Sequence, residues 1–189
     1  AYGACLYLFA YVGGWFGDRV FGPERTLLTG CGLLVAGHLC LAFIPGYAGL
    51  AAGLLAIALG SGLLKTAAIT LLGLAFPDRA GSRDAAFQIF YLGINVGALF
   101  GPLLTGWLAQ QYGFHVGFGA AAVLMVAGAA MYLALRPKVL AALGQEAIGR
   151  PAQPIASGRA AAIVAAGAAF IAIILALLAT GVLLSLIHI

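Results

Sequence analysis

The chain has 189 residues, of which 64% are hydrophobic and 7% are charged, and its formal net charge is +4. Soluble domains carry roughly 25% charged residues, so this composition excludes an ordinary soluble domain, a disordered chain and a nucleic-acid binder. Because so little charge cannot keep the surface in water, we expect most of that surface to face lipid.

Long apolar runs follow one another along the chain. A hydrocarbon core of about 30 Å needs about 20 apolar helical residues, and runs of about that length lie at 26–44, 50–76, 85–109, 116–135 and 160–184. A further run, 1–17, has no initiator Met, signal peptide or basic flank before it, and we interpret it as the tail of a helix that begins upstream. These runs predict an all-α, polytopic transmembrane helical bundle, because a β-barrel would show alternating segments of about ten residues.

The charged residues gather in alternate connections between the runs. All 5 acidic residues and all but one of the 9 basic residues lie in 18–25, 77–84 and 136–159. The turns at 45–47 and 110–115 carry none. Since Lys and Arg mark cytoplasmic loops, this alternation predicts that the three charged connections are cytoplasmic.

One charged residue, Lys65, falls inside the run 50–76. A lysine at the centre of a membrane helix costs roughly 2.5–3.5 kcal/mol on insertion scales, and such residues usually face a bundle interior or a watery cavity. The alternative is that the side chain snorkels to the cytoplasmic edge, but Lys65 lies about 16 Å of helix from Phe76, beyond the reach of a lysine. No acidic residue occurs in any apolar run, so its expected partner is a ligand or a carboxylate outside this sequence.

The run 85–109 has two different faces. Glycine recurs every four residues, at Gly93, Gly97 and Gly101. This small-residue spacing lets another helix approach closely. Three polar side chains, Gln88, Tyr91 and Asn95, point about 180° away from that stripe. Polar groups at membrane depth need water or partners, so Asn95 either faces a cavity or only hydrogen-bonds a neighbouring helix.

Cysteines and histidines give weaker signals. Cys5, Cys31 and Cys40 lie in apolar runs without CxxC spacing, and we interpret them as small packing residues, neither disulfides nor metal ligands. His38 is interpreted as a structural polar residue, and His115 falls in an outer turn, where we expect it to be solvated. Nothing resembles a metal cluster, a phosphate-binding loop or a nucleophile with its base, so we expect no catalytic residues, no metal site and no enzyme.

The first charged connection carries a loop motif. Gly14, Asp18, Arg19, Gly22 and Arg25 follow the spacing Gly-x3-Asp-Arg-x2-Gly-x2-Arg. This spacing resembles the motif between helices 2 and 3 of the major facilitator superfamily. There the acidic residue caps and pairs across helix ends and gates the inward side, so the resemblance implies a gating role for this loop.

Longer stretches are similar to the proton-dependent oligopeptide transporter family. Residues 87–99, FQIFYLGINVGAL, look like its signature, and the stretches 83–84, 113–118 and 60–65 fit the same family. The resemblance runs over nearly the whole chain.

The resemblance also implies a division of the chain. Residues 1–135 would hold helices 2 to 6 of an N-terminal six-helix bundle, with helix 1 and its ExxER motif missing. Residues 136–159 would form a cytoplasmic linker. Residues 160–189 would form a truncated extra helix of the kind that some bacterial members insert before helix 7.

Site residues follow from the same resemblance. Lys65 matches the helix-4 lysine that sits near the peptide carboxylate and the proton-coupling carboxylate. Asn95 matches a helix-5 asparagine that hydrogen-bonds the peptide backbone, and Tyr7 matches a helix-2 tyrosine that lines the cavity. Tyr91 is included as a substrate-binding residue because it shares a face with Asn95.

The function implied by the resemblance is proton-coupled import of di- and tripeptides across the inner (cytoplasmic) membrane, by alternating access around a midplane site. The partners would be the peptide, protons and the lipid bilayer, without nucleic acid. No cofactor is expected besides the proton as coupling ion, and the coupling carboxylate is expected outside this sequence.

Two other functions stay open at this point. The same fold could carry another solute, such as nitrate, a drug or a sugar, because Thr66-Ala67 stands where the family commonly has Pro-Asn and so lacks an amide. The chain could also belong to a non-transporting membrane receptor or assembly factor, which should tolerate loss of Lys65. Lys65 and Asn95 together favour the peptide.

Overall fold

The computed structural model describes residues 10–11, 13–76, 80–143, 151 and 154–179, and every secondary-structure element in these ranges is helical. The elements are a short π-helix η1 (Gly17–Phe21), α2 (Pro23–Phe43), α3 (Gly46–Ala75), α4 (Ala80–Tyr112), α5 (Phe114–Leu143) and α6 (Ser157–Ala179). Within these ranges, four helices, α2 to α5, are long and apolar enough to cross a membrane. The predicted all-α, multi-pass bundle is therefore confirmed. Tyr7 and Cys5 lie outside the described residues.

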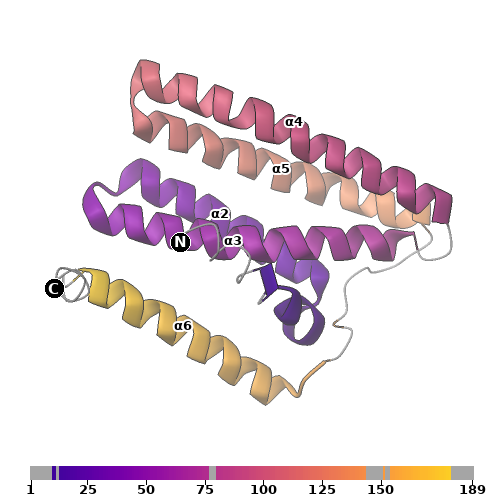
Figure 1. Ribbon diagram of the computed structural model, residues 1–189. Helices are drawn as coiled ribbons and strands as arrows, with labels where there is room; N and C mark the ends of the chain where they lie inside the picture. Colours follow the sequence, from indigo (N-terminus) through magenta and orange to yellow (C-terminus); the bar gives the residue numbers. More distant parts are fainter. Residues whose placement is uncertain (1–9, 12, 77–79, 144–150, 152–153, 180–189) are drawn as a thin grey trace.

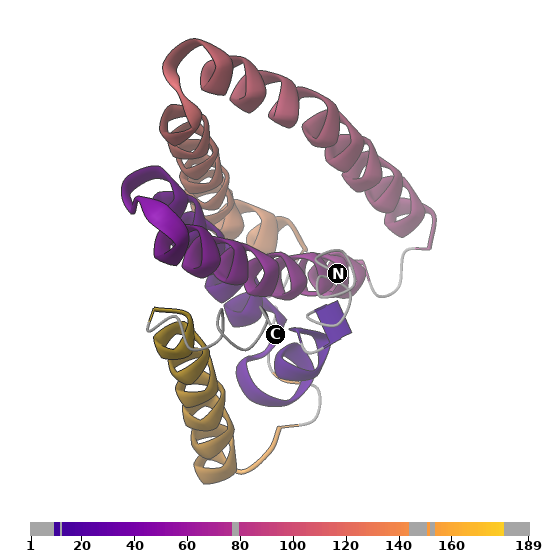
Figure 2. The same cartoon turned by 60° about the vertical axis from the view of Figure 1, so that its left-hand side comes forward.

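The helices form a layered arrangement (Figure 1). The pair α2 and α3 lies side by side, α5 packs on α2, and α4 packs on α5. The helix α6 lies on the other side of the α2–α3 pair, and in the turned view α4 bows outward from the rest (Figure 2). Leu27, Ala67 and Leu71 form a buried hydrophobic cluster, against which Cys31 and Tyr132 also pack. Cys31 is thus a packing residue, as predicted.

Several helices extend beyond the apolar runs into the charged connections. α2 begins at Pro23, a residue that suits the first helical turn because its missing N–H would be unpaired there anyway. α4 begins at Ala80 and α5 continues through Pro137 to Leu143. The apolar runs therefore locate only the part of each helix that lies in lipid. The helix can continue beyond that part into water, where charged side chains are solvated.

Close glycine contacts join α2 to α3. A Cβ atom added at Gly30 would lie 2.9 Å from the carbonyl oxygen of Gly60, and one added at Gly37 would lie 2.8 Å from that of Gly53. No room exists for a side chain at these positions, so the two backbones touch. Glycine is what allows this approach.

The glycine stripe of α4 has different surroundings. A Cβ atom added at Gly93, Gly97 or Gly101 would meet nothing within 4 Å, so the expected close helix contact at this stripe is absent from the described part of the chain. Instead, the last third of α4 packs on the start of α5. There, a Cβ atom added at Gly117 would lie 2.7 Å from the carbonyl oxygen of Thr105.

His115 connects the end of α2 to the start of α5, and it is exposed, as the prediction of a solvated side chain requires. Its Nδ1 atom lies 3.2 Å from the carbonyl oxygen of Leu41. That carbonyl would normally accept a bond from the residue four positions later, but this residue is Pro45, which has no N–H. The tight turn at Gly113, whose φ is 95°, brings His115 to this position.

Candidate substrate-binding and gating site

Lys65 lies in the middle part of α3 with its side chain exposed. It follows Gly60 by five positions and therefore points about 140° around the helix from the glycine contact with α2. The packing of α2 against α3 thus directs Lys65 away from the glycine contact between these two helices. An exposed cation on this face is suitably placed to meet an anionic group.

The threonines that follow Lys65 bond to their own helix. The hydroxyl of Thr66 donates to the carbonyl oxygen of Gly62 at 2.9 Å, and that of Thr70 donates to Thr66 at 3.0 Å. Thr66 stands where the resembling family commonly has proline, which would remove a helical hydrogen bond. α3 is therefore continuous past Lys65, and the Thr66 hydroxyl is already engaged.

Asn95 and Tyr91 lie one turn apart on α4, and both are exposed. The Nδ2 atom of Asn95 donates to the backbone carbonyl of Tyr91 at 2.8 Å. An asparagine amide has a second N–H and an acceptor oxygen, so Asn95 keeps one donor and one acceptor for another group. This pattern matches a peptide unit, which offers one N–H and one C=O.

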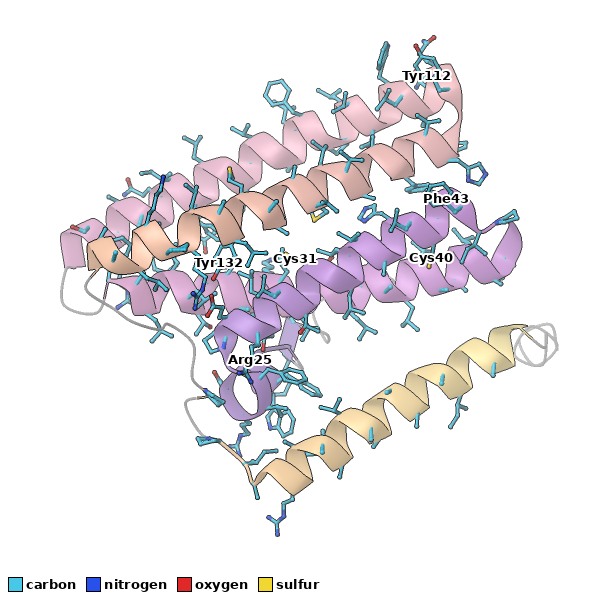
Figure 3. The ribbon with its side chains drawn as sticks, turned by 180° about the vertical axis from the view of Figure 1, so that it is seen from behind. Arg25, Cys31, Cys40, Phe43, Tyr112 and Tyr132 are labelled. Carbon is cyan, nitrogen blue, oxygen red and sulfur yellow. The ribbon has the colours of Figure 1, made fainter. Side chains whose placement is uncertain are left out.

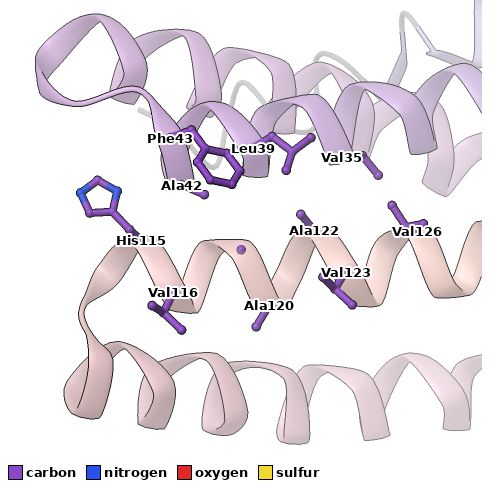
Figure 4. Close-up of a pocket in the computed structure, with 11 residues that line it drawn as sticks. Val35, Leu39, Ala42, Phe43, His115, Val116, Ala120, Ala122, Val123 and Val126 are labelled. Carbon is purple, nitrogen blue, oxygen red and sulfur yellow. The ribbon is translucent and has the colours of Figure 1, made fainter.

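The structure brings Asn95 and Tyr91 together but places Lys65 on a different helix. A cavity of about 650 Å³ lies elsewhere, between the second half of α2 and the first half of α5, and neither Lys65 nor Asn95 lines it (Figure 4). Its walls are aliphatic apart from Phe43 and His115. Such a lining has no cation for a peptide carboxylate, so this cavity is not a candidate for a peptide site.

The loop motif occupies the junction between η1 and α2. Gly14 precedes η1, Asp18 and Arg19 lie within it, and Gly22 connects it to α2, where Arg25 is in the first turn. Gly22 has a φ of 79°, which glycine adopts at little cost. The residue at the N-cap of α2 is Gly22, without a side-chain cap bond. In the described part of the chain Asp18 therefore does not cap the start of α2, and its capping and gating role stays a prediction.

A cluster that the sequence analysis missed connects this region to α5. Arg136 donates from Nε to Oε1 of Glu24 and from Nη2 to Oε2, the latter at 2.9 Å. The hydroxyl of Tyr132 donates to Oε1 at 3.2 Å. Opposite charges at two expected cytoplasmic helix ends were the available signal, but the charged connections allowed many other pairings.

These features define a multi-pass membrane protein, with a cation on a long apolar helix and a charged loop between two helices. A model of the POT family matches residues 24–139 of the chain. The match covers more than half of the sequence, and the chain belongs to this family.

Individual relatives agree with this assignment. The uncharacterized transporter YclF of Bacillus subtilis (strain 168) is 38% identical over 143 residues, which cover 76% of this chain and 29% of that protein. The di-/tripeptide transporter of Lactococcus lactis subsp. lactis (strain IL1403) is 36% identical over 156 residues, 82% of this chain and 31% of that protein. A crystal structure of peptide transporter POT in complex with sulfate is 42% identical, with a TM-score of 0.81, over 95% of this chain and 36% of that one. The chain thus spans about three tenths of the length of these curated relatives.

Proposed function

We propose that the chain forms part of a proton-coupled symporter that imports di- and tripeptides across the cytoplasmic membrane by alternating access. Membership in the POT family supports this function, as does similarity to a relative named as a di-/tripeptide transporter. In this proposal, 1–135 contributes helices to the N-terminal bundle, 136–159 is a cytoplasmic linker and 160–189 an extra helix. The inner membrane is the proposed location, with protons and lipid as the other partners.

Lys65 is the observation that carries the proposal. A small peptide presents a terminal carboxylate, and a cation on a long apolar helix is a direct complement to it. Asn95 would meet the peptide backbone with its remaining donor and acceptor. Tyr91 and Tyr7 are the further proposed contacts. Because these groups bind backbone and terminus, the site would accept many peptide side chains.

Proton coupling needs a titrating carboxylate at membrane depth. All 5 acidic residues of this sequence lie in 18–25, 77–84 and 136–159. We therefore place the coupling carboxylate in the part of the relatives' length that this chain does not span. The loop with Asp18 and Arg25 is proposed to gate the cytoplasmic side.

The test compares peptides with a free and an amidated C-terminus, using the intact transporter, meaning this chain together with the remaining length that its relatives have. Amidation should weaken binding to the wild type by about tenfold or more, equivalent to about 1.4 kcal/mol. In Lys65→Ala the same amidation should change the Kd less than about twofold, because the contact is already lost. Binding constants for both peptides and both proteins are the measurement.

Two further variants complete this experiment. Lys65→Arg should restore binding poorly, because a planar guanidinium does not reproduce a compact ammonium. Lys138→Ala removes an exposed cation near the end of α5 and should keep the discrimination of the wild type. If amidation weakened binding equally in wild type and Lys65→Ala, Lys65 would not be the partner of the carboxylate.

A further inference from the structure

The cluster of Glu24, Tyr132 and Arg136 joins the first turn of α2 to the last part of α5. Glu24 accepts from both nitrogens of the Arg136 fork and from the Tyr132 hydroxyl. The side chain of Glu24 is only 16% exposed, and that of Arg136 is 34% exposed. Figure 3 shows Tyr132 between α5 and the first half of α2. We call these three residues the cytoplasmic clamp.

Three donors fix the carboxylate of Glu24 in one position. A bidentate arginine–carboxylate pair has a defined geometry as well as strength, and Tyr132 adds a third hydrogen bond. Glu24 also lies in the first turn of α2, where the helix dipole favours a negative charge. The start of α2 is therefore held against α5 by a cluster that tolerates little displacement.

The start of α2 in turn supports the loop motif. Thr26 is fully buried, and both its backbone N–H and its hydroxyl donate to the carbonyl oxygen of Gly22, at 3.0 and 2.8 Å. A Cβ atom added at Gly17 would lie 3.6 Å from the Thr26 hydroxyl oxygen, so η1 packs directly on this side chain. If Glu24 moved, Thr26 would move with it. Because Thr26 contacts both Gly22 and Gly17, the loop would shift as well.

The loop is also held from its other side. The backbone N–H of Ile155, just before α6, donates to the carbonyl oxygen of Arg19 at 3.1 Å. Arg19 lies inside η1. The segment that carries Asp18 and Arg19 thus lies between the start of α2, held by α5, and the chain that leads into α6.

We propose that Glu24, Tyr132 and Arg136 are positioning residues for residues 17–25 of the loop motif, which they hold in one conformation by fixing the start of α2 to α5. The positioning follows from the contacts alone. Its consequence, that the clamp sets how readily the cytoplasmic gate opens, rests on the proposed function.

Hydrogen–deuterium exchange of the 189-residue chain in lipid nanodiscs tests the positioning without any substrate. Glu24→Gln and Arg136→Gln should each raise the exchange rate of the amides at 17–25 by about tenfold, because each leaves a partly buried charged or polar group without its partner. The amides at 43–50, at the opposite ends of α2 and α3, should keep their rates. Lys138→Gln, two residues from Arg136 and exposed, is the matched control and should change neither region.

The double variant Glu24→Gln/Arg136→Gln tests whether Glu24 and Arg136 act through their interaction with each other or independently. If the two act as one clamp, the double variant should exchange no faster at 17–25 than the faster single variant, because no charge is left unpaired. Effects that multiply would overturn the proposal. So would unchanged exchange at 17–25 in both single variants, or an equal rise at 43–50, which would indicate a contribution to overall folding only.

Tyr132→Phe keeps the test decisive if a charge variant does not fold. It removes one hydroxyl and leaves the aromatic ring packed against the Leu27 cluster. We expect a rise of roughly threefold, restricted to the amides at 17–25. A rise spread evenly along α2, or none at 17–25, would contradict the clamp. Since no step depends on peptide binding, failure here would leave the proposed function untouched.

Discussion

The α2–α3 pair and α4 use the same residue type to different ends. Gly30 and Gly60 bring two backbones into contact, and a Cβ atom on either would lie within 3 Å of the other helix. On α4, Gly93 and Gly97 face open space in the described part of the chain. Regular glycine spacing therefore permits a close helix contact, but a contact forms only where a second helix crosses at the matching height.

The residues proposed to bind the ligand lie away from the contact between α2 and α3. Asn95 and Tyr91 lie on α4. No residue in the most apolar stretch of this helix is buried in the described structure. Lys65 lies on α3 but on the side away from α2. The contacts that stabilise this chain and the groups proposed to bind a ligand thus occupy different surfaces, so substitutions on the two surfaces should have separable effects.

The largest expected effect comes from a leucine in the glycine contact. Gly60→Leu should destabilise the chain by about 3 kcal/mol, at the upper end of overpacking effects, because its Cβ would lie 2.8 Å from the carbonyl oxygen of Gly30. Gly97→Leu, in open space, should instead stabilise the helix by about 0.5–1 kcal/mol, because leucine has a higher helix propensity than glycine. Denaturant titration of both variants in micelles, followed by helical circular dichroism, is the measurement. Equal losses would remove the distinction between the two regions.

Smaller changes in stability, of opposite sign, are expected for two glycines of α2. Gly30→Ala should cost about 1–2 kcal/mol, since the added methyl group would lie 2.7 Å from the backbone nitrogen of Leu64. Gly32→Ala, two residues away with nothing within 4 Å, should stabilise the helix by about 0.5–1 kcal/mol through helix propensity. The same titration measures both, and stabilisation by Gly30→Ala would show that α2 and α3 do not touch there.

The smallest expected change in stability comes from the hydrogen bond between His115 of α5 and Leu41 of α2. His115→Ala should cost about 1 kcal/mol, because the Leu41 carbonyl loses its donor and Pro45 cannot replace it. Among the described residues, His38 bonds within its own helix, to Leu34 at 2.7 Å, so His38→Ala should cost less than about 0.5 kcal/mol. Thermal unfolding of the two variants compares a bond between helices with one inside a helix. A larger loss in His38→Ala would reverse this assignment.

The sequence by itself determined that the chain is a bundle of membrane helices and where the apolar parts of α2 to α5 lie. This follows because apolar runs of about 20 residues can satisfy their backbone hydrogen bonds in lipid only as helices. It also singled out Lys65, since a charge in such a run is conspicuous. The one-turn spacing of Tyr91 and Asn95 and their shared face followed from helical periodicity alone, and the structure adds the hydrogen bond between them.

Only the tertiary structure decided which surfaces meet. Periodicity is a property of one segment, whereas a contact depends on the crossing point of two segments that lie far apart in the chain. For this reason periodicity alone could not show that Gly60 packs against Gly30, nor that no helix lies against Gly97 in the described part of the chain. Glu24 and Arg136, 112 positions apart, form their ion pair because α5 returns along α2. That return is set by packing, which charge spacing along the sequence does not encode.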